Sequence, residues 1–523
     1  MDIYDGDDGE PMITHGGTLT SKTHVKDVAT AIAKYAFITS PYPVIISAEI
    51  HCGLVQQKRL KEIFSHAFGE ALVVAPVDEG HSEGDEIKCL PSPDQLKERI
   101  LLKAKNKYID ATRSKIQKLP DEPPSSDDSD KEAEKRHSGL RDKFNQMWKR
   151  TPLQNLAPSG SKRPDTPPIP GTSAPPRSSS ASVVAPSQTE GQPPKVLMDP
   201  ELLPLLVYTT GVSFRGLSDA QVYPITHLFS LSEPRANSLI YSGADVLRLV
   251  DHTREHLVRV YPKGTRVDSS NFVPHKYWAC GCQLVTVNWQ TVGECLIQSQ
   301  LGVLFTTSGL LDLGFSMVQA FYARNGRAGY ILKPEALRIR NHPVLSYKPT
   351  KHKLVIRVIS AQQLPRPKDA QGREIIDKNT VDPYVRVEVH SPTWPTSAMA
   401  AVPVKNNVER GLKTRTSVIR NNGFNPRWNE TLELDFDVLG GMSEFVFVRF
   451  VIKDKDVDRD NWIGMYCACL KTLELGEKIL ARSPSSTFDL LFVGYRHVPL
   501  YDEQYGQYMF STLFVHLSIR DDK

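Results

Sequence analysis

The stretch AIAKYAFITSPYPVIISAEIHC, residues 31–52, places a helical pattern directly before a short apolar run. Apolar residues recur at helical spacing in and just before this stretch, at Val25, Val28, Ala29, Ile32, Tyr35 and Ala36. Ser21 or Thr23 is the expected cap of this helix. The apolar run at 44–46 follows Pro41 and Pro43 and predicts a buried strand.

Strand and helix patterns continue to alternate along this part of the chain. A second amphipathic helix is predicted from apolar residues at helical spacing, namely Leu60, Ile63, Phe64, Phe68 and Leu72. Two further apolar runs, at 71–75 and 100–102, predict buried strands. Strand, helix and strand in this rhythm favour a parallel sheet with helices on its outside.

The pattern changes twice after residue 118. Residues 118–195 are first acidic and then rich in Pro and Ser, which predicts a disordered linker with one short helix around 140–147. Short apolar strands and helical stretches such as 234–249 return between about 202 and 340. Beyond Leu354 apolar and polar residues alternate, as they do around Val385, Val387 and Val389. This period of two favours an antiparallel β-sandwich.

Charge and composition exclude several classes of protein. The 523 residues include 64 basic and 60 acidic side chains, and the net charge of +4 gives no reason to expect a nucleic-acid partner. The first ten residues, MDIYDGDDGE, lack the basic and apolar regions of a signal peptide. The most apolar long stretch, 295–321, is interrupted by polar residues and does not predict a membrane span. We therefore expect a cytoplasmic protein that contacts membranes peripherally.

Several long motifs resemble one family, and they occur in that family's order. DGEPMITHGGTLTSK, AIAKYAFITSPYPVIISAEIHC and LPSPDQLKERILLKAKNK resemble the X region of eukaryotic phosphoinositide-specific phospholipase C. VSFRGLS, FSLSE, RVYPKGTRVDSSNF, GCQLVTVNWQT and NGRAGYILKP resemble its Y region. RVISAQQLPRPK, VDPYVRVEVH, NNGFNPRWNETLELDF and DRDNWIG resemble the calcium- and lipid-binding sandwich that follows the Y region. Motifs of this length in one order are more specific than any short pattern.

The resemblance implies a multidomain fold, in which X and Y are halves of one distorted TIM-type α/β barrel split by the linker and followed by the antiparallel sandwich. We expect the X half at 1–112, the linker at 113–198, the Y half at 199–342 and the sandwich at 350–523. Met1 corresponds to a position after the family's first barrel strand, so the barrel is expected to lack that strand. The apolar stretch around 298–318 exceeds the family's spacing and is either a genuine insert or translated intervening sequence.

Polar side chains follow three of the predicted strands. Glu49 follows VIIS after one alanine, Lys103 and Lys105 end the second run, and Arg259 and Tyr261 close LVRVYP. The chemistry of TIM barrels lies at the carboxyl ends of the strands, and residues two apart share one face of a strand. Taken singly, each would be an ordinary solvated side chain. Their joint occurrence inside long motifs favours a site.

Matched residue by residue, the resemblance implies a role for each of these positions. His15 corresponds to an active-site histidine that stabilises phosphorane oxygens, Glu49 to a calcium ligand that also helps as a base, and Asp2 to a second calcium-binding carboxylate. Contacts to ring phosphates or the inositol headgroup are implied for Lys103, Lys105, Ser232, Arg259 and Tyr261. In the sandwich, calcium is expected at Asp382, Asn421, Asp454, Asp456 and Asp460.

The implied activity is the calcium-dependent hydrolysis of phosphatidylinositol 4,5-bisphosphate to inositol trisphosphate and diacylglycerol in intracellular signalling. Calcium suits developing charge on phosphoryl oxygens because it accepts hard carboxylate ligands and keeps open positions. The expected partners are phosphoinositide lipids, an anionic membrane surface and a protein activator that the sequence does not identify, and the expected state is a monomer.

Two expectations concern the activity of this particular chain. The family's first catalytic histidine and further calcium ligands correspond to positions before Met1, so the chain as written is expected to be weakly active or inactive. The alternative to an enzyme is a catalytically inactive protein that binds anionic membranes in a calcium-dependent way.

Overall fold

A computed structural model describes most of the chain, and the statements below concern the residues that it describes. These residues are 1–14, 22–77, 86–109, 198–218, 221–264, 266, 270–289, 313–340, 350–366, 381–392, 412–438, 442–456, 460–473, 478–482, 488–502 and 505–522. The predicted linker, with its helix around 140–147, lies outside them apart from its last residue, Met198.

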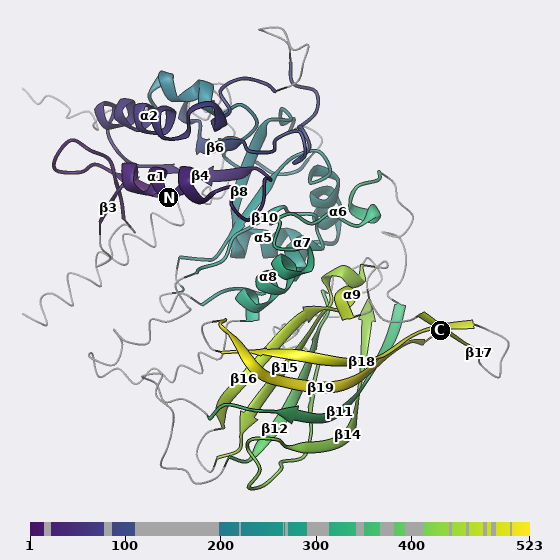
Figure 1. The fold of residues 1–523 in the computed structure, drawn as a ribbon. Coiled ribbons are helices and arrows are strands. Elements are labelled where there is room, and N and C mark those ends of the chain that lie inside the picture. Colours follow the sequence, from purple (N-terminus) through teal and green to yellow (C-terminus); the bar gives the residue numbers. More distant parts are fainter. Residues whose placement is uncertain are drawn as a thin grey trace, which may run out of the picture.

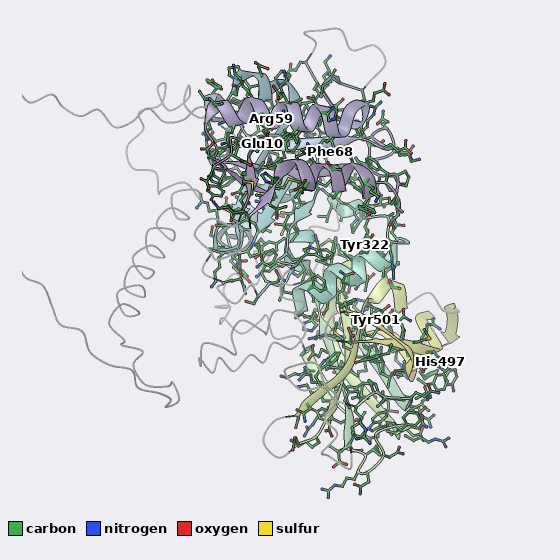
Figure 2. The ribbon with its side chains drawn as sticks, turned by 60° about the vertical axis from the view of Figure 1, so that its left-hand side comes forward. Glu10, Arg59, Phe68, Tyr322, His497 and Tyr501 are labelled. Atoms are coloured by element: carbon green, nitrogen blue, oxygen red, sulfur yellow. The ribbon has the colours of Figure 1, made fainter. Side chains whose placement is uncertain are left out.

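The chain before the linker forms short strands and two long helices (Figure 1). The elements are β1 (Asp2–Tyr4), β2 (Met12–Ile13), β3 (Thr23–His24), α1 (Val25–Tyr35), β4 (Val44–Ser47), β5 (Glu49–Ile50), α2 (Leu54–Phe68), the 3-10 turn η1 (Gly69–Ala71) and β6 (Ile100–Lys105). Arg59 of α2 pairs with Glu10, with Nε 2.9 Å from Oε1, and this pair ties α2 to the loop before β2 (Figure 2).

The chain after the linker continues the same alternation of strands and helices. Its elements are η2 (Pro200–Leu205), β7 (Thr210–Val212), β8 (His227–Ser232), α5 (Glu233–Ile240), α6 (Gly243–His252), β9 (Val258–Tyr261), α7 (His275–Trp278), β10 (Leu284–Val285), α8 (Leu313–Arg324) and η4 (Glu335–Leu337). Strands from both sides of the linker form one six-stranded sheet in the order β10-β9-β8-β7-β6-β4. All pairs in this sheet are parallel.

The pairing of β6 with β7 joins the two halves of this sheet. Ala104 lies opposite Thr210 and Lys105 opposite Gly211, and the Asn106 amide donates to the Gly211 carbonyl at 2.8 Å. The strands approach so closely that a Cβ on Gly211 would lie 2.7 Å from the carbonyl oxygen of Ala104. A glycine is therefore needed at this position.

The local predictions for the first helix and strand are confirmed, except for the helix cap. α1 begins at Val25, as the apolar spacing predicts, and β4 covers the predicted apolar run. The cap is wrong: His24 is the N-cap residue and makes no side-chain capping bond. Thr23 is unavailable for capping because it lies in β3, paired with Ile13, and Ser21 lies outside the described residues.

Three other local predictions need correction. The second helix starts earlier than predicted, at Leu54, where the Asp5 carboxylate accepts the amide of the N-cap residue Gly53. The run at 71–75 is not a strand, because it makes only a single bridge from Leu72 to Ile100. The helical stretch 234–249 is two helices, α5 and α6, separated at Tyr241 and Ser242.

The last part of the chain is the predicted antiparallel sandwich. Its elements are β11 (Thr350–Gln362), β12 (Pro383–His390), β13 (Leu412–Arg415), β14 (Arg427–Val438), η6 (Ser443–Phe445), β15 (Phe447–Asp454), β16 (Asn461–Cys469), α9 (Leu470–Leu473), β17 (Lys478–Arg482), β18 (Phe488–Tyr501) and β19 (Gln507–Asp522). One continuous core contains alternate residues from both layers, such as Val387 and Phe450 from one and Ile356 and Val515 from the other.

α8 lies where the parallel sheet and the sandwich meet (Figure 1). Met317 of α8 is fully buried in a cluster with Phe447 of β15 and two cysteines of β16, Cys467 and Cys469. Phe321 stacks on Trp278 of α7 with ring centroids 4.4 Å apart. The end of the predicted insert thus forms part of an apolar joint, while its residues 298–312 lie outside the described residues.

Helices that could span a membrane are absent from the described ranges. Within them, every helix is too short or too polar to cross a bilayer.

Replacing Gly211 by Ala tests the seam between the halves. We expect the free energy of unfolding to fall by about 1–3 kcal/mol, because the new methyl group meets a backbone carbonyl that cannot rotate away. Denaturant unfolding measures this, with Gly264→Ala as the control because a Cβ there meets no atom within 4 Å. Equal stability of the two variants would contradict the proposed close approach.

Candidate functional site

Two carboxylates predicted to bind calcium, Asp2 and Glu49, lie on neighbouring strands of the candidate site. β1 and β5 pair in parallel, with Asp2 opposite Glu49. These two strands belong to a small sheet in the order β3-β2-β1-β5. The guanidinium of Arg259, from β9 of the six-stranded sheet, reaches this pair, with Nη1 3.9 Å from Oε1 of Glu49. The fold thus brings together an acidic pair from one half and a cation from the other.

Lys103 is the most buried cation of the site. It lies opposite Ser47 in the β4–β6 pair, and only 6% of its surface is exposed. Burial, together with the charges of Arg259 and Lys105, lowers the pKa of Lys103 to about 8, while Glu49 opposes the shift. A buried amine surrounded by other cations is stabilised in its charged form when an anion binds beside it.

The predicted headgroup residues of the second half lie on neighbouring strands. Ser232 at the end of β8 is opposite Tyr261 at the end of β9. The Arg259 guanidinium lies over the Tyr261 ring at 4.9 Å, which places these two side chains on one face, as their spacing predicts. The carboxyl ends of β6, β8 and β9 therefore supply basic, hydroxyl and aromatic groups to one edge of the sheet.

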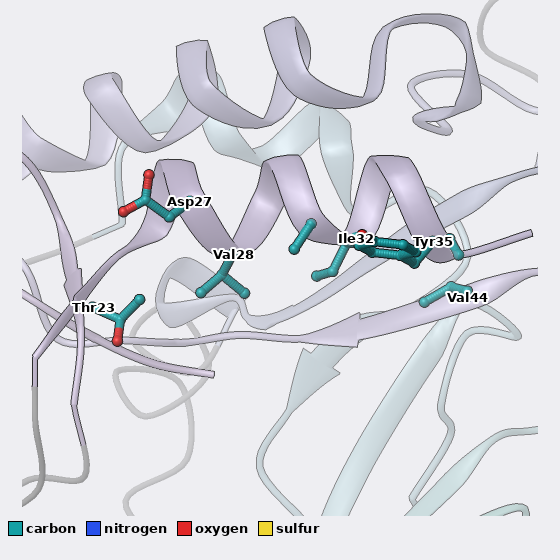
Figure 3. A pocket seen from close by; sticks show the side chains of 8 residues that line it. Thr23, Asp27, Val28, Ile32, Tyr35 and Val44 are labelled. Atoms are coloured by element: carbon teal, nitrogen blue, oxygen red, sulfur yellow. The ribbon is translucent and has the colours of Figure 1, made fainter.

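Two features do not belong to this group of side chains at the strand ends: one predicted site residue and one surface groove. His15 lies outside the described residues, so the structure does not place it. An apolar groove of about 620 Å³ runs along α1, between Thr23 and Val44 (Figure 3). The groove includes none of the predicted site residues.

The loops at one end of the sandwich bring its predicted ligands together through direct hydrogen bonds. The amide of Asp382 donates to Oδ1 of Asp454 at 2.7 Å, and the amide of Asn421 donates to Oδ1 of Asp382 at 2.8 Å. Asn421 adopts a left-handed backbone conformation, with φ of 58°. Asn461 Nδ2 donates to Oδ2 of Asp456 at 3.2 Å. Carboxylates and an amide are thus gathered at the ends of β12 and β15.

Asp460 is held by an interaction that the sequence pattern did not predict. Its Oδ1 accepts from Lys455 Nζ at 2.9 Å, and its Oδ2 accepts from the Tyr384 hydroxyl at 2.7 Å. Burial, together with the neighbouring Asp460, raises the pKa of Tyr384 to about 12. Lys455 lies between Asp454 and Asp456 in the sequence, and this position within an acidic loop is the sequence signal for an ion pair with Asp460.

The residue types at the two predicted calcium sites suit calcium, but their arrangement does not form a complete site. Asp2 with Glu49, and Asp382 with Asp454, offer the hard oxygens that calcium prefers. Among the described residues, however, no group of three or more Asp, Glu, His or Cys side chains is arranged to hold a metal ion. Each pair therefore fits as part of a coordination shell rather than as a complete cage.

Comparisons with known families match three parts of the chain. The sequence model of the phosphatidylinositol-specific phospholipase C X domain matches residues 1–106, and that of the Y domain matches residues 202–336. The C2 domain model matches residues 352–483. These matches confirm the resemblance drawn from the motifs.

Individual relatives show the same likeness over the whole chain. A 1-phosphatidylinositol 4,5-bisphosphate phosphodiesterase delta-4 from Bos taurus is 31% identical, covering 100% of this chain and 57% of the relative. The delta-3-A phosphodiesterase from Danio rerio is 30% identical, covering 99% of this chain and 52% of the relative. The crystal structure of S. officinalis PLC21 superposes with a TM-score of 0.61 at 26% identity, covering 99% of this chain and 50% of that one. The chain thus spans about half the length of these relatives.

Replacing Lys103 by Met tests the buried cation. Its lowered pKa means that the unfolded chain holds this proton more tightly, so the wild type gains stability as the pH rises from about 8 to 10.5. We expect Lys103→Met to raise the free energy of unfolding at pH 7 by about 1–3 kcal/mol and to remove that pH dependence. Denaturant unfolding between pH 7 and 10.5 measures both effects, and a destabilised variant would show that the charge is compensated within the fold.

Proposed function

Because the chain belongs to the family of phosphatidylinositol-specific phospholipases C, we propose that it is a calcium-dependent phosphoinositide phosphodiesterase. The proposed reaction converts phosphatidylinositol 4,5-bisphosphate to inositol trisphosphate and diacylglycerol in intracellular signalling. The observation that carries this proposal is the grouping of Lys103, Arg259 and Glu49 at the carboxyl ends of parallel strands. A polyphosphorylated ring needs cations for its phosphates beside carboxylates that hold a divalent ion.

The side chains divide the binding of the headgroup among the strands. Lys103 and Lys105, on one face of β6, bind the ring phosphates, and an incoming phosphate offsets the cost of burying the Lys103 ammonium. Tyr261 stacks on the sugar ring and is oriented by the guanidinium of Arg259. Ser232, opposite Tyr261, contacts the headgroup through its hydroxyl.

The proposed chemistry is an internal displacement followed by hydrolysis. The inositol 2-hydroxyl attacks phosphorus and its proton passes to Glu49, while the bond between phosphorus and the diacylglycerol oxygen breaks. The departing oxygen takes a proton from water to give diacylglycerol, and a second water then opens the cyclic phosphate that is left. His15 stabilises the phosphorane oxygens. Calcium bound by Asp2 and Glu49 would supply further charge neutralisation at those oxygens.

We also propose a cellular location, an oligomeric state and binding partners for the protein. It acts in the cytoplasm as a monomer that associates peripherally with anionic membranes, under the control of a protein activator. The sandwich, which matches the C2 domain, supplies the membrane contact through the loops that carry Asp382 and Asp454.

Release of inositol trisphosphate from mixed micelles tests the proposed activity. We expect weak calcium-dependent release that a chelator abolishes, and a further fall of about 10²-fold or more in Lys103→Met, because the variant loses a charged contact to the ring phosphates. The matched control is Lys353→Met, since Lys353 lies on the sandwich and pairs with Glu433. Release that is absent, or unaffected by chelator and by Lys103→Met, would contradict the proposal.

The gathered carboxylates of the sandwich favour a second candidate, a catalytically inactive protein that binds anionic membranes with calcium. Calcium between Asp382, Asp454 and Asp456 would offset the acidity of these loops and let them approach anionic lipid. Sedimentation with liposomes containing phosphatidylserine distinguishes this candidate, which requires calcium-dependent binding without any release of inositol trisphosphate.

Replacing Lys455 by Met tests whether its ammonium competes with calcium. The ion pair with Asp460 places a cation among the predicted ligands. We expect Lys455→Met to bind calcium severalfold more tightly and to sediment with liposomes at lower calcium, because the competing charge is gone. Isothermal titration with calcium measures the affinity, with Lys353→Met again as the control, and an unchanged affinity would show that Lys455 and calcium do not share Asp460.

A further inference from the structure

Polar side chains cross the carboxyl ends of three neighbouring strands just beyond the candidate site. Glu233 follows Ser232 at the end of β8, and only 7% of its surface is exposed. Arg266 lies after the end of β9, and Asn288 lies after the end of β10. We call the set Glu233, Arg266, Ser270, Asn271 and Asn288 the exit belt.

The part of the exit belt between β8 and β9 is an ion pair with two parallel bonds. Arg266 Nη2 donates to Oε1 of Glu233 at 2.6 Å, and Arg266 Nε donates to Oε2 at 2.8 Å. The amide of Lys263 also donates to Oε2, at 3.4 Å. Burial raises the pKa of Glu233, but Arg266 and the Lys263 amide outweigh burial and hold the pKa below its usual value. The pair is therefore charged at neutral pH.

The part of the exit belt between β9 and β10 is made of neutral groups. Arg266 Nη1 donates to Oγ of Ser270 at 3.1 Å. The next residue, Asn271, accepts from the amide of Asn288 at 2.5 Å and donates from Nδ2 to the Asn288 carbonyl at 2.9 Å. Asn288 Nδ2 also donates to the Ser270 carbonyl at 3.4 Å, so the residues of the belt are linked from the end of β8 to the chain beyond β10.

The belt adjoins the proposed headgroup residues on both strands. Glu233 is the neighbour of Ser232, and Lys263 is two residues beyond Tyr261. We propose that the Glu233–Arg266 pair is a positioning device, which fixes the ends of β8 and β9 relative to each other and so sets Ser232 against Tyr261 and Arg259. The inference rests on the proposed function and assigns Glu233 and Arg266 no contact with the substrate.

The Glu233–Arg266 pair is expected to contribute fixed geometry rather than stability. A buried ion pair is often no more stabilising than an apolar pair of the same volume, because both charges lose their hydration. A bidentate guanidinium–carboxylate pair, however, fixes both distance and angle, since the two planar groups meet through two parallel bonds. Sites that recognise a rigid ligand need their side chains held within a fraction of an ångström.

Calorimetric titration of the full chain with inositol 1,4,5-trisphosphate tests the proposal. We expect Glu233→Gln to raise Kd about tenfold while the chain stays folded, because the strand ends lose their fixed spacing. Arg266→Lys, which keeps the charge but not the two parallel bonds, should raise Kd by a similar factor with little change in the thermal midpoint. The control is Asp245→Asn, which removes an exposed ion pair with Arg248 on α6 and should leave Kd unchanged.

A double-mutant cycle separates positioning from a general loss of structure. If Glu233 acts through Tyr261, adding Glu233→Gln to Tyr261→Ala should weaken binding much less than it does in the wild type. The proposal would be overturned if Kd in the double variant rose by the product of the two single factors, which would mean that the residues act independently. An unchanged Kd in both Glu233→Gln and Arg266→Lys would also overturn it.

Amide exchange gives a reading that does not depend on the ligand. Glu233→Gln should speed exchange at the amide of Lys263, whose acceptor is weakened, whereas Asp245→Asn should not. Failure of the wild type to bind inositol 1,4,5-trisphosphate would count against the proposed function. Unchanged exchange at residues 259–263 in Glu233→Gln would count against the exit belt itself.

Discussion

The pairing of β6 with β7 is the constraint on which the candidate site depends. These two strands lie more than a hundred residues apart in the sequence, yet they are adjacent in one parallel sheet. Side chains from the second half complete the core of the first, including Met198, Leu202 and Leu205. The amide of Asp199 also donates to the buried side chain of Gln57 at 2.7 Å. Without this seam, Arg259 and Glu49 would belong to separate surfaces.

The site shows a conflict between stability and binding that is common where proteins recognise anions. Lys103 is buried beside Arg259, and both burial and the neighbouring charge disfavour its ammonium form. An apolar residue is expected to suit the fold better, but it could not make the proposed contact with a phosphate. The pairing of β6 with β4 fixes the backbone position of Lys103 in the sheet.

The joint around α8 connects the site to the sandwich. Met317 packs against Phe447 and the cysteines of β16, and the Tyr505 hydroxyl donates to the Ser316 carbonyl at 3.4 Å. An apolar interface of this kind restricts relative motion more than a polar one does. The loops around Asp382 and Asp454 are thus carried on a body that packs against helices α7 and α8.

Local patterns in the sequence determined the helices, the strands and the period of the sandwich, because apolar residues recur with the repeat of the element that buries them. α1, β4 and β12 lie where the spacing predicts them. The motifs also marked Glu49, Lys103 and Arg259. Tertiary structure alone decided that these three meet, that Lys455 holds Asp460, and that Arg266 holds Glu233. The contacts of Arg259 and Arg266 join separate elements, and the Lys455–Asp460 pair closes the loop between β15 and β16. Their geometry depends on strand register and loop path, which one-dimensional spacing does not contain.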